Sequence, residues 1–132
     1  MPSVPSPLVR RFDHSSDFSD VAAARHFVRQ ALADVDSAIS ADLQLAVSEL
    51  MTNAIEHAAS PQVTVEVAID VDEVVLTVTS HGSGPLAPVA TWEPAPPEAS
   101  AGRGLAIVRS VATNVTVDHV DDTLRISVHR AR

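Results

Sequence analysis

The spacing of apolar residues changes at Pro61, and this change limits the folds that the chain can adopt. Before Pro61, apolar residues recur at the spacing of one helix face. After it, Val63, Val65, Val67 and Ile69 alternate with polar residues, as in a strand with one buried face. The pattern therefore predicts a domain that combines helices and strands, with two helices grouped ahead of a run of strands.

The same reasoning predicts the remaining elements and their order. Ser19 and Ser40 precede the two helical patterns and are candidate N-caps. The expected helices cover 20–34, 40–58 and 103–112, and the expected strands cover 8–13, 63–69, 74–79, 115–119 and 124–128. Because helices do not alternate with single strands, we expect an α+β fold. We expect this fold to be a two-layer sandwich with helices on one face of a mixed, mostly antiparallel sheet.

The length of 132 residues fits a single domain. Residues 1–8 are rich in Pro and Ser and are expected to form a disordered tail, which leaves 9–132 as the domain. The stretch 82–102 contains five of the nine prolines and Trp92. Long segments without secondary structure in a compact domain are typically functional lids or inserts, so we expect a lid at about 82–102.

The charge balance excludes several functions. The net charge is −8 and lysine is absent, which argues against nucleic acid, against anionic membranes and against a phosphate-loop lysine. There is no cysteine, and the six histidines are scattered without the spacing of a zinc site. No apolar run approaches the ~20 residues of a membrane span, and the N-terminus lacks a signal peptide. The expected location is the cytoplasm.

A polar stripe on the second predicted helix is the first candidate site. Glu49, Asn53 and Glu56 are spaced four and three apart, and Asp42 lies on the same stripe two turns earlier. Such a stripe is often only a solvated face. However, Asn is a poor helix former, and its amide oxygen suits magnesium. A carboxylate one turn away could deprotonate a hydroxyl that attacks a γ-phosphate.

Two glycine-containing segments are the second and third candidates. Residues 80–84 (SHGSG) follow a predicted strand, and residues 102–108 (GRGLAIV) open a predicted helix. Glycines permit close approach of the backbone to a ligand, and N–H groups at a helix start bind phosphates. Arg103 adds a positive charge there. Taken singly, each segment is equally compatible with an ordinary turn or hinge.

Together these segments make a more specific pattern. With residues 49–58 (ELMTNAIEHA), the sequence resembles the ATP-binding domains of the gyrase, chaperone, histidine-kinase and mismatch-repair superfamily, known as the Bergerat fold. Within it, the chain is most similar to bacterial anti-sigma-factor serine/threonine kinases, over about residues 8–130. The resemblance implies ATP and Mg²⁺ as cofactors, Glu49 as general base and Asn53 as magnesium ligand.

The resemblance also implies roles for other positions. Gly82 and Gly84 match the turn beneath the adenine, and Thr123 matches a threonine near the adenine amino group. Four residues match the end of the lid around the phosphates: Gly102, Arg103, Gly104 and Leu105. His57 matches a frequent family histidine, without an assigned role. Ser80 stands where the family has an aspartate that accepts from the adenine, and this change should cost roughly 1.5–3 kcal/mol of binding.

The implied function is a partner-switching regulator. It would sequester a sigma factor and use ATP to phosphorylate a serine or threonine of a STAS-type antagonist, and homodimers are also implied. The alternative is a non-catalytic protein-interaction module of the same fold, either ATP-binding or ATP-independent, which Ser80 favours. A detached histidine-kinase catalytic domain ranks lower, because the surroundings of His26 do not resemble a phosphoacceptor site.

Overall fold

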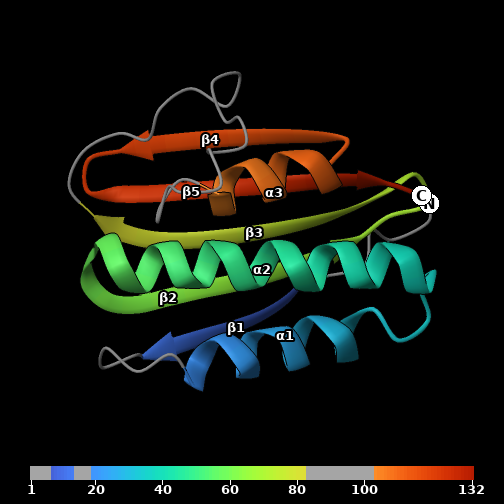
Figure 1. Cartoon of the computed structure of the whole chain (residues 1–132), viewed down its shortest axis with the longest axis horizontal. Coiled ribbons are helices and arrows are strands. Elements are labelled where there is room, and N and C mark those ends of the chain that lie inside the picture. Colours follow the sequence, from blue (N-terminus) through green and yellow to red (C-terminus); the bar gives the residue numbers. More distant parts are fainter. Residues whose placement is uncertain (1–6, 14–18, 83–102) are drawn as a thin grey trace.

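The computed structural model describes residues 7–13, 19–82 and 103–132 (Figure 1). These residues form three helices and five strands. In chain order the elements are β1 (Leu8–Asp13), α1 (Ser19–Ala31), α2 (Ser37–His57), β2 (Ala58–Ile69), β3 (Glu73–Gly82), α3 (Arg103–Val111), β4 (Asn114–Val120) and β5 (Thr123–Ala131).

The strands form one sheet in the order β1-β2-β3-β5-β4. All four pairings are antiparallel, so the described sheet contains no parallel pair and is more regular than the mixed sheet that we expected. The three helices lie side by side over one face of the sheet (Figure 1). The predicted α+β class and the two-layer architecture are therefore confirmed.

The core fills the space between the helices and this face of the sheet. Leu43, Val47 and Leu50 of α2 are almost fully buried, as are Val65 of β2 and Leu76 of β3. Each such side chain stabilises the fold by about 1.5–3 kcal/mol through removal of apolar surface from water. The aliphatic composition is sufficient for this core, because valine and leucine pack well between a helix and a pleated sheet.

The start of α2 corrects the predicted cap. Asp36, rather than Ser40, caps the helix, because its Oδ1 accepts a hydrogen bond from the backbone N–H of Ala38 at 2.8 Å. Ser40 lies inside the helix, where it is only 8% exposed, and its hydroxyl accepts from Nε2 of Gln44. Both residue types cap helices, and because α2 already begins at Ser37, the residue that stands at its N-terminus is Asp36.

Other boundaries also differ from the prediction: β2 begins at Ala58 rather than Val63, and β5 ends at Ala131 rather than Val128. Helix α1 ends at Ala31 instead of Asp34, because Ala33 and Val35 donate to carbonyls three residues back, which tightens the final turn. Strand β3 continues to Gly82, although we expected a glycine turn from Ser80. The extra residues are held by β5, where Leu124 pairs with Ser80 and Thr123 pairs with His81.

Most of the predicted lid, residues 83–102, and most of the predicted tail, residues 1–6, lie outside the described residues. Within the ranges that the structure describes, none of the helices has the length and apolar character needed to cross a membrane.

Candidate functional site

The polar stripe of α2 faces the strand β5. Asp42 lies on this stripe, and its Oδ2 accepts a hydrogen bond from Nε of Arg130 on β5 at 3.1 Å. Residues that follow at helical spacing share the same side of the helix. Glu49 and Asn53, two and three turns further on, therefore face the side of α2 where α3 packs against it.

The side chains of Glu49 and Asn53 are half-buried and lack hydrogen-bond partners among the described residues. The side of α2 nearer α1 behaves differently. There, a ladder of bonds joins Gln44 Nε2 to Ser40 Oγ, Ser48 Oγ to the carbonyl of Gln44, and Thr52 Oγ1 to the carbonyl of Ser48. Since half-buried polar groups favour hydrogen bonding, the open stripe is the side of α2 suited to a ligand.

The end of β3 supplies the second part of the site. Ser80 is 6% exposed and lies in phase with Leu76 and Val78, so its side chain is on the face covered by the helices. A buried hydroxyl can accept one hydrogen bond from a base, but it carries no charge to strengthen that bond. Gly82 ends the strand, where it pairs with Ala58 of β2, and Gly84 lies outside the described residues.

The start of α3 supplies the third part. Arg103 is the first residue of α3, and α3 packs beside α2. Leu105 is half-buried against the core. The C-terminal end of α2, the end of β3 and the start of α3 lie toward the same end of the molecule (Figure 1). The unpaired N–H groups of the first turn of α3 are suited to phosphate oxygens. Gly102 is outside the described residues; Gly104 follows Arg103 in α3.

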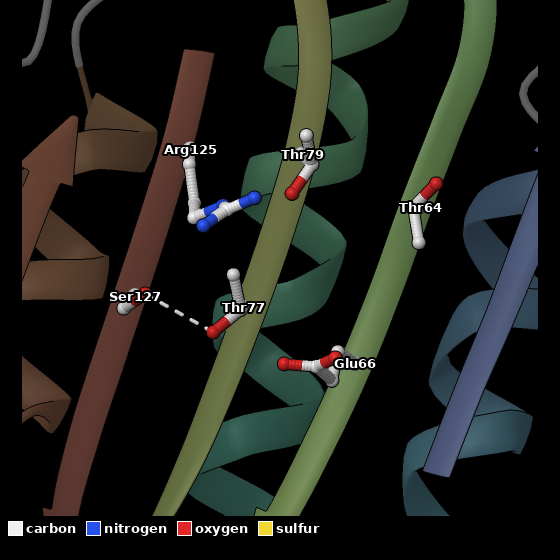
Figure 2. Close-up of a pocket in the computed structure, with 6 residues that line it drawn as sticks. All are labelled: Thr64, Glu66, Thr77, Thr79, Arg125 and Ser127. Carbon is white, nitrogen blue, oxygen red and sulfur yellow. Dashed lines mark hydrogen bonds between the residues drawn. The ribbon is translucent and has the colours of Figure 1, made fainter. Parts of the chain in front are cut away.

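Thr123 lies on the other face of the sheet. Strand alternation puts it in phase with Arg125 and Ser127, and its Oγ1 lies 3.4 Å from Nδ1 of His81. That face carries an open hollow of about 420 Å³, with α2 behind the sheet (Figure 2). The hollow is lined by Thr64, Glu66, Thr77, Thr79, Arg125 and Ser127. This placement does not support the nucleotide contact implied for Thr123, which we leave out of the proposed site.

His119 of β4 lies in the row of Ser80, and the sequence patterns did not single it out as a candidate site residue. The register places Ser80, Leu124 and His119 in one row across β3, β5 and β4. Nε2 of His119 is buried and has no hydrogen-bond partner within the described part of the chain. Its phase with the buried Val115 and the half-buried Val117 of β4 is the sequence signal that could have found it.

The oxygen ligands that the site offers suit magnesium. The described residues contain no group of three or more His, Asp or Glu side chains able to hold a metal by themselves. Magnesium commonly takes one or two protein ligands and completes its shell with water and phosphate oxygens. The single amide oxygen of Asn53, on a half-buried helix face, fits an ion of this kind.

Comparison with protein-family models decides the family. Residues 14–128 match the histidine kinase-like ATPase domain. The chain belongs to this family. The match confirms the resemblance to the ATP-binding superfamily that the sequence motifs carried, and it covers α2, β3 and α3, which form the candidate site. A search of curated protein sequences finds no match to this chain.

Solved structures share the fold of the ATPase domain. The RsbU and RsbW domains of Rv1364c from Mycobacterium tuberculosis superpose with a TM-score of 0.70 at 21% identity, covering 97% of this chain. The chain spans about a third, 33%, of that mycobacterial chain. The SiaB-SiaC complex from Pseudomonas aeruginosa gives 0.62 at 14% identity, covering 95% of this chain and 89% of that one. The Acinetobacter baumannii histidine kinase AdeS superposes with a TM-score of 0.57 at 14% identity. The superposition covers 94% of this chain and 67% of the AdeS chain.

Proposed function

We propose that this ATPase domain binds Mg-ATP and phosphorylates a serine or threonine of a protein antagonist, within a partner switch that controls a sigma factor. The observation that carries the proposal is the pair Glu49 and Asn53. They lie one turn apart on a half-buried stripe of α2 and lack partners among the described residues. Membership of an ATPase family and the resemblance of residues 49–58 to anti-sigma-factor kinases support it.

The proposed chemistry divides the roles among the parts of the site. Asn53 donates its amide oxygen to a magnesium ion that, when bound, neutralises charge on the phosphate oxygens. Glu49 accepts the proton of the partner's hydroxyl as the hydroxyl oxygen forms its bond to the γ-phosphorus. The bond from the γ-phosphorus to the bridging oxygen breaks, and ADP leaves. Arg103 and the N–H groups at the start of α3 hold the phosphates.

The proposed partner chemistry follows the same resemblance. The phosphorylated protein is a STAS-type antagonist, the sequestered protein is a sigma factor, and the kinase acts as a homodimer in the cytoplasm. The SiaB-SiaC structure is that of a protein complex, and its fold covers 95% of this chain, which supports a domain of this fold acting through a protein partner.

Calorimetric titration of Mg-ATP tests the pocket. Asn53→Ala should weaken Mg-ATP binding by about tenfold or more, because the magnesium loses its protein ligand. Ser48→Ala is the matched control, since Ser48 lies on the other side of α2 and bonds only the carbonyl of Gln44. Equal affinities for Asn53→Ala and wild type would refute the assignment.

Phosphotransfer to purified STAS-type proteins tests the catalytic role. Glu49→Gln should still bind Mg-ATP but lose at least about a hundredfold in the rate of transfer, as expected for a general base. Normal transfer by this variant at saturating ATP would show that Glu49 is not the base.

A non-catalytic module is the second candidate, and the neutral, buried Ser80 favours it. In that case the wild type would bind partner proteins equally with and without Mg-ATP. It would also show no saturable binding of ATP at millimolar concentrations.

A further inference from the structure

Helix α1 presents a basic surface in an acidic protein. The chain carries a net charge of −8, yet residues 21–33 contain no Asp or Glu. Arg25, His26 and Arg29 all lie in this stretch, and all three are exposed. Arg25 and Arg29 are one helical turn apart, so their guanidinium groups project from the same side of α1, about 6 Å from each other at the backbone. Asp20, in the first turn, is the one acidic residue of α1, so the side of the helix that carries Arg25 and Arg29 is positively charged.

These side chains line a hollow between α1 and α2. The hollow has a volume of about 470 Å³, and its lining residues are Ala22, Arg25, His26, Arg29 and Gln44. Gln44 lies on the side of α2 that carries the bonded ladder, whereas Glu49 and Asn53 lie on the side toward α3. The basic hollow and the proposed nucleotide site therefore occupy opposite flanks of α2.

The contacts inside the hollow leave the guanidinium groups of Arg25 and Arg29 able to bind an anion. Nη2 of Arg29 lies 3.1 Å from Nδ1 of His26. Since a guanidinium can only donate, Nδ1 must be the acceptor, and this bond steadies Arg29 on the helix surface. Arg25 forms no ion pair with any residue that the structure describes. Both cations therefore retain N–H donors that are not paired with any carboxylate in the part of the chain that the structure describes.

We propose that this hollow docks an acidic segment of a protein partner, with two neighbouring carboxylates held by Arg25 and Arg29. Two guanidinium groups a turn apart can each take a separate carboxylate in a two-bond fork. The inference rests on the proposed function only in taking the partner to be a protein.

Two-dimensional NMR of the ¹⁵N-labelled full chain tests the surface directly, with a hexaglutamate peptide as the probe at low ionic strength. The side-chain Nε–Hε and backbone resonances of Arg25 and Arg29 should shift most. Arg25→Glu should weaken binding about tenfold, because it replaces attraction by repulsion. The matched control is Arg125→Glu, which makes the same charge change on the exposed, opposite face of the sheet and should alter binding less than about twofold.

Three results would overturn the proposal. Equal weakening by Arg125→Glu would reduce the effect to overall charge. Equal shifts with inorganic phosphate at matched charge would make the hollow a site for small anions. Loss of Mg-ATP binding in Arg25→Glu would place the hollow in the nucleotide site. If peptide binding behaves as expected while no variant or wild type binds Mg-ATP, the docking surface stands and the proposed kinase function fails.

Discussion

Arg130 of β5 and Asp42 of α2 are joined by a hydrogen-bonded ion pair of 3.1 Å between Nε and Oδ2. The pair connects the final strand to the first half of the 21-residue helix. The buried side chains of Leu43, Val47 and Leu50 fix the rotation of α2, and the ion pair marks the flank of the helix on which the polar stripe lies. Glu49 and Asn53 follow Asp42 on that flank at helical spacing.

The ion pair itself should contribute little to stability. Its side chains are 29% and 34% exposed, so water screens the attraction. A double-mutant cycle with Asp42→Ala and Arg130→Ala should give a coupling of about 0.5 kcal/mol in urea unfolding, and the coupling should fall at high salt. A coupling of several kcal/mol would show that the pair is far more shielded than its exposure indicates.

Ser80→Asp should restore a charged acceptor at the end of β3. We expect Mg-ATP to bind about ten- to a hundredfold more tightly, measured by calorimetry, because a charged hydrogen bond replaces a neutral one. The same variant should be less stable without nucleotide by about 1–3 kcal/mol, because the position is only 6% exposed and the new carboxylate is left unpaired.

The matched control for this gain is Ser80→Asn, which has the size of Asp but no charge. It should not reproduce the increase in affinity. If Ser80→Asn and Ser80→Asp bind Mg-ATP equally well, then the length of the Ser80 side chain, rather than its lack of charge, limits the affinity of the wild type for Mg-ATP. Our explanation from the missing charge would then be wrong.

Leu50 and Leu45 give a matched pair on one helix. Leu50 is 1% exposed and Leu45 is 42% exposed. Leu50→Ala should lower the free energy of unfolding by about 3 kcal/mol, since it leaves a cavity under α2. Leu45→Ala should change it by less than roughly 0.5 kcal/mol. Urea unfolding followed by circular dichroism measures both, and similar losses in the two variants would contradict the described packing.

The cap at Asp36 is tested by removing its carboxylate. Asp36→Ala should destabilise the domain by about 1 kcal/mol, because the N–H of Ala38 loses its acceptor. Ser37→Ala, at the next exposed position, should have almost no effect on thermal unfolding. A larger loss for Ser37→Ala than for Asp36→Ala would place the cap one residue later.

The sequence was sufficient for features that depend on local periodicity. The spacing of Leu43, Val47 and Leu50 predicts the buried face of α2, and the same period places Glu49 and Asn53 on one stripe. Alternation along residues 63–69 predicts a half-buried strand, and the structure buries Val63, Val65 and Val67.

Features that depend on partners distant in sequence were not predictable from such patterns. Ser80 and His81 belong to β3 because β5, more than forty residues later, pairs with them. The face occupied by Thr123 follows from its phase with Arg125, opposite the buried Ile126 and Val128; this alternation is visible in the sequence, but matching the family motif did not use it. Matching a motif residue by residue does not determine which side of a sheet a side chain takes.

The position of β5 inside the sheet has a consequence for how the protein is made. Although β5 comes after the other described strands in the chain, it lies between β3 and β4 and forms bonds on both of its edges. A growing chain on the ribosome therefore has β3 with one edge exposed, and β4 with no strand beside it, until residues 123–131 leave the exit tunnel. Because unpaired edges invite association with other chains, this interval is the stage of biosynthesis at which a chaperone would protect the protein most.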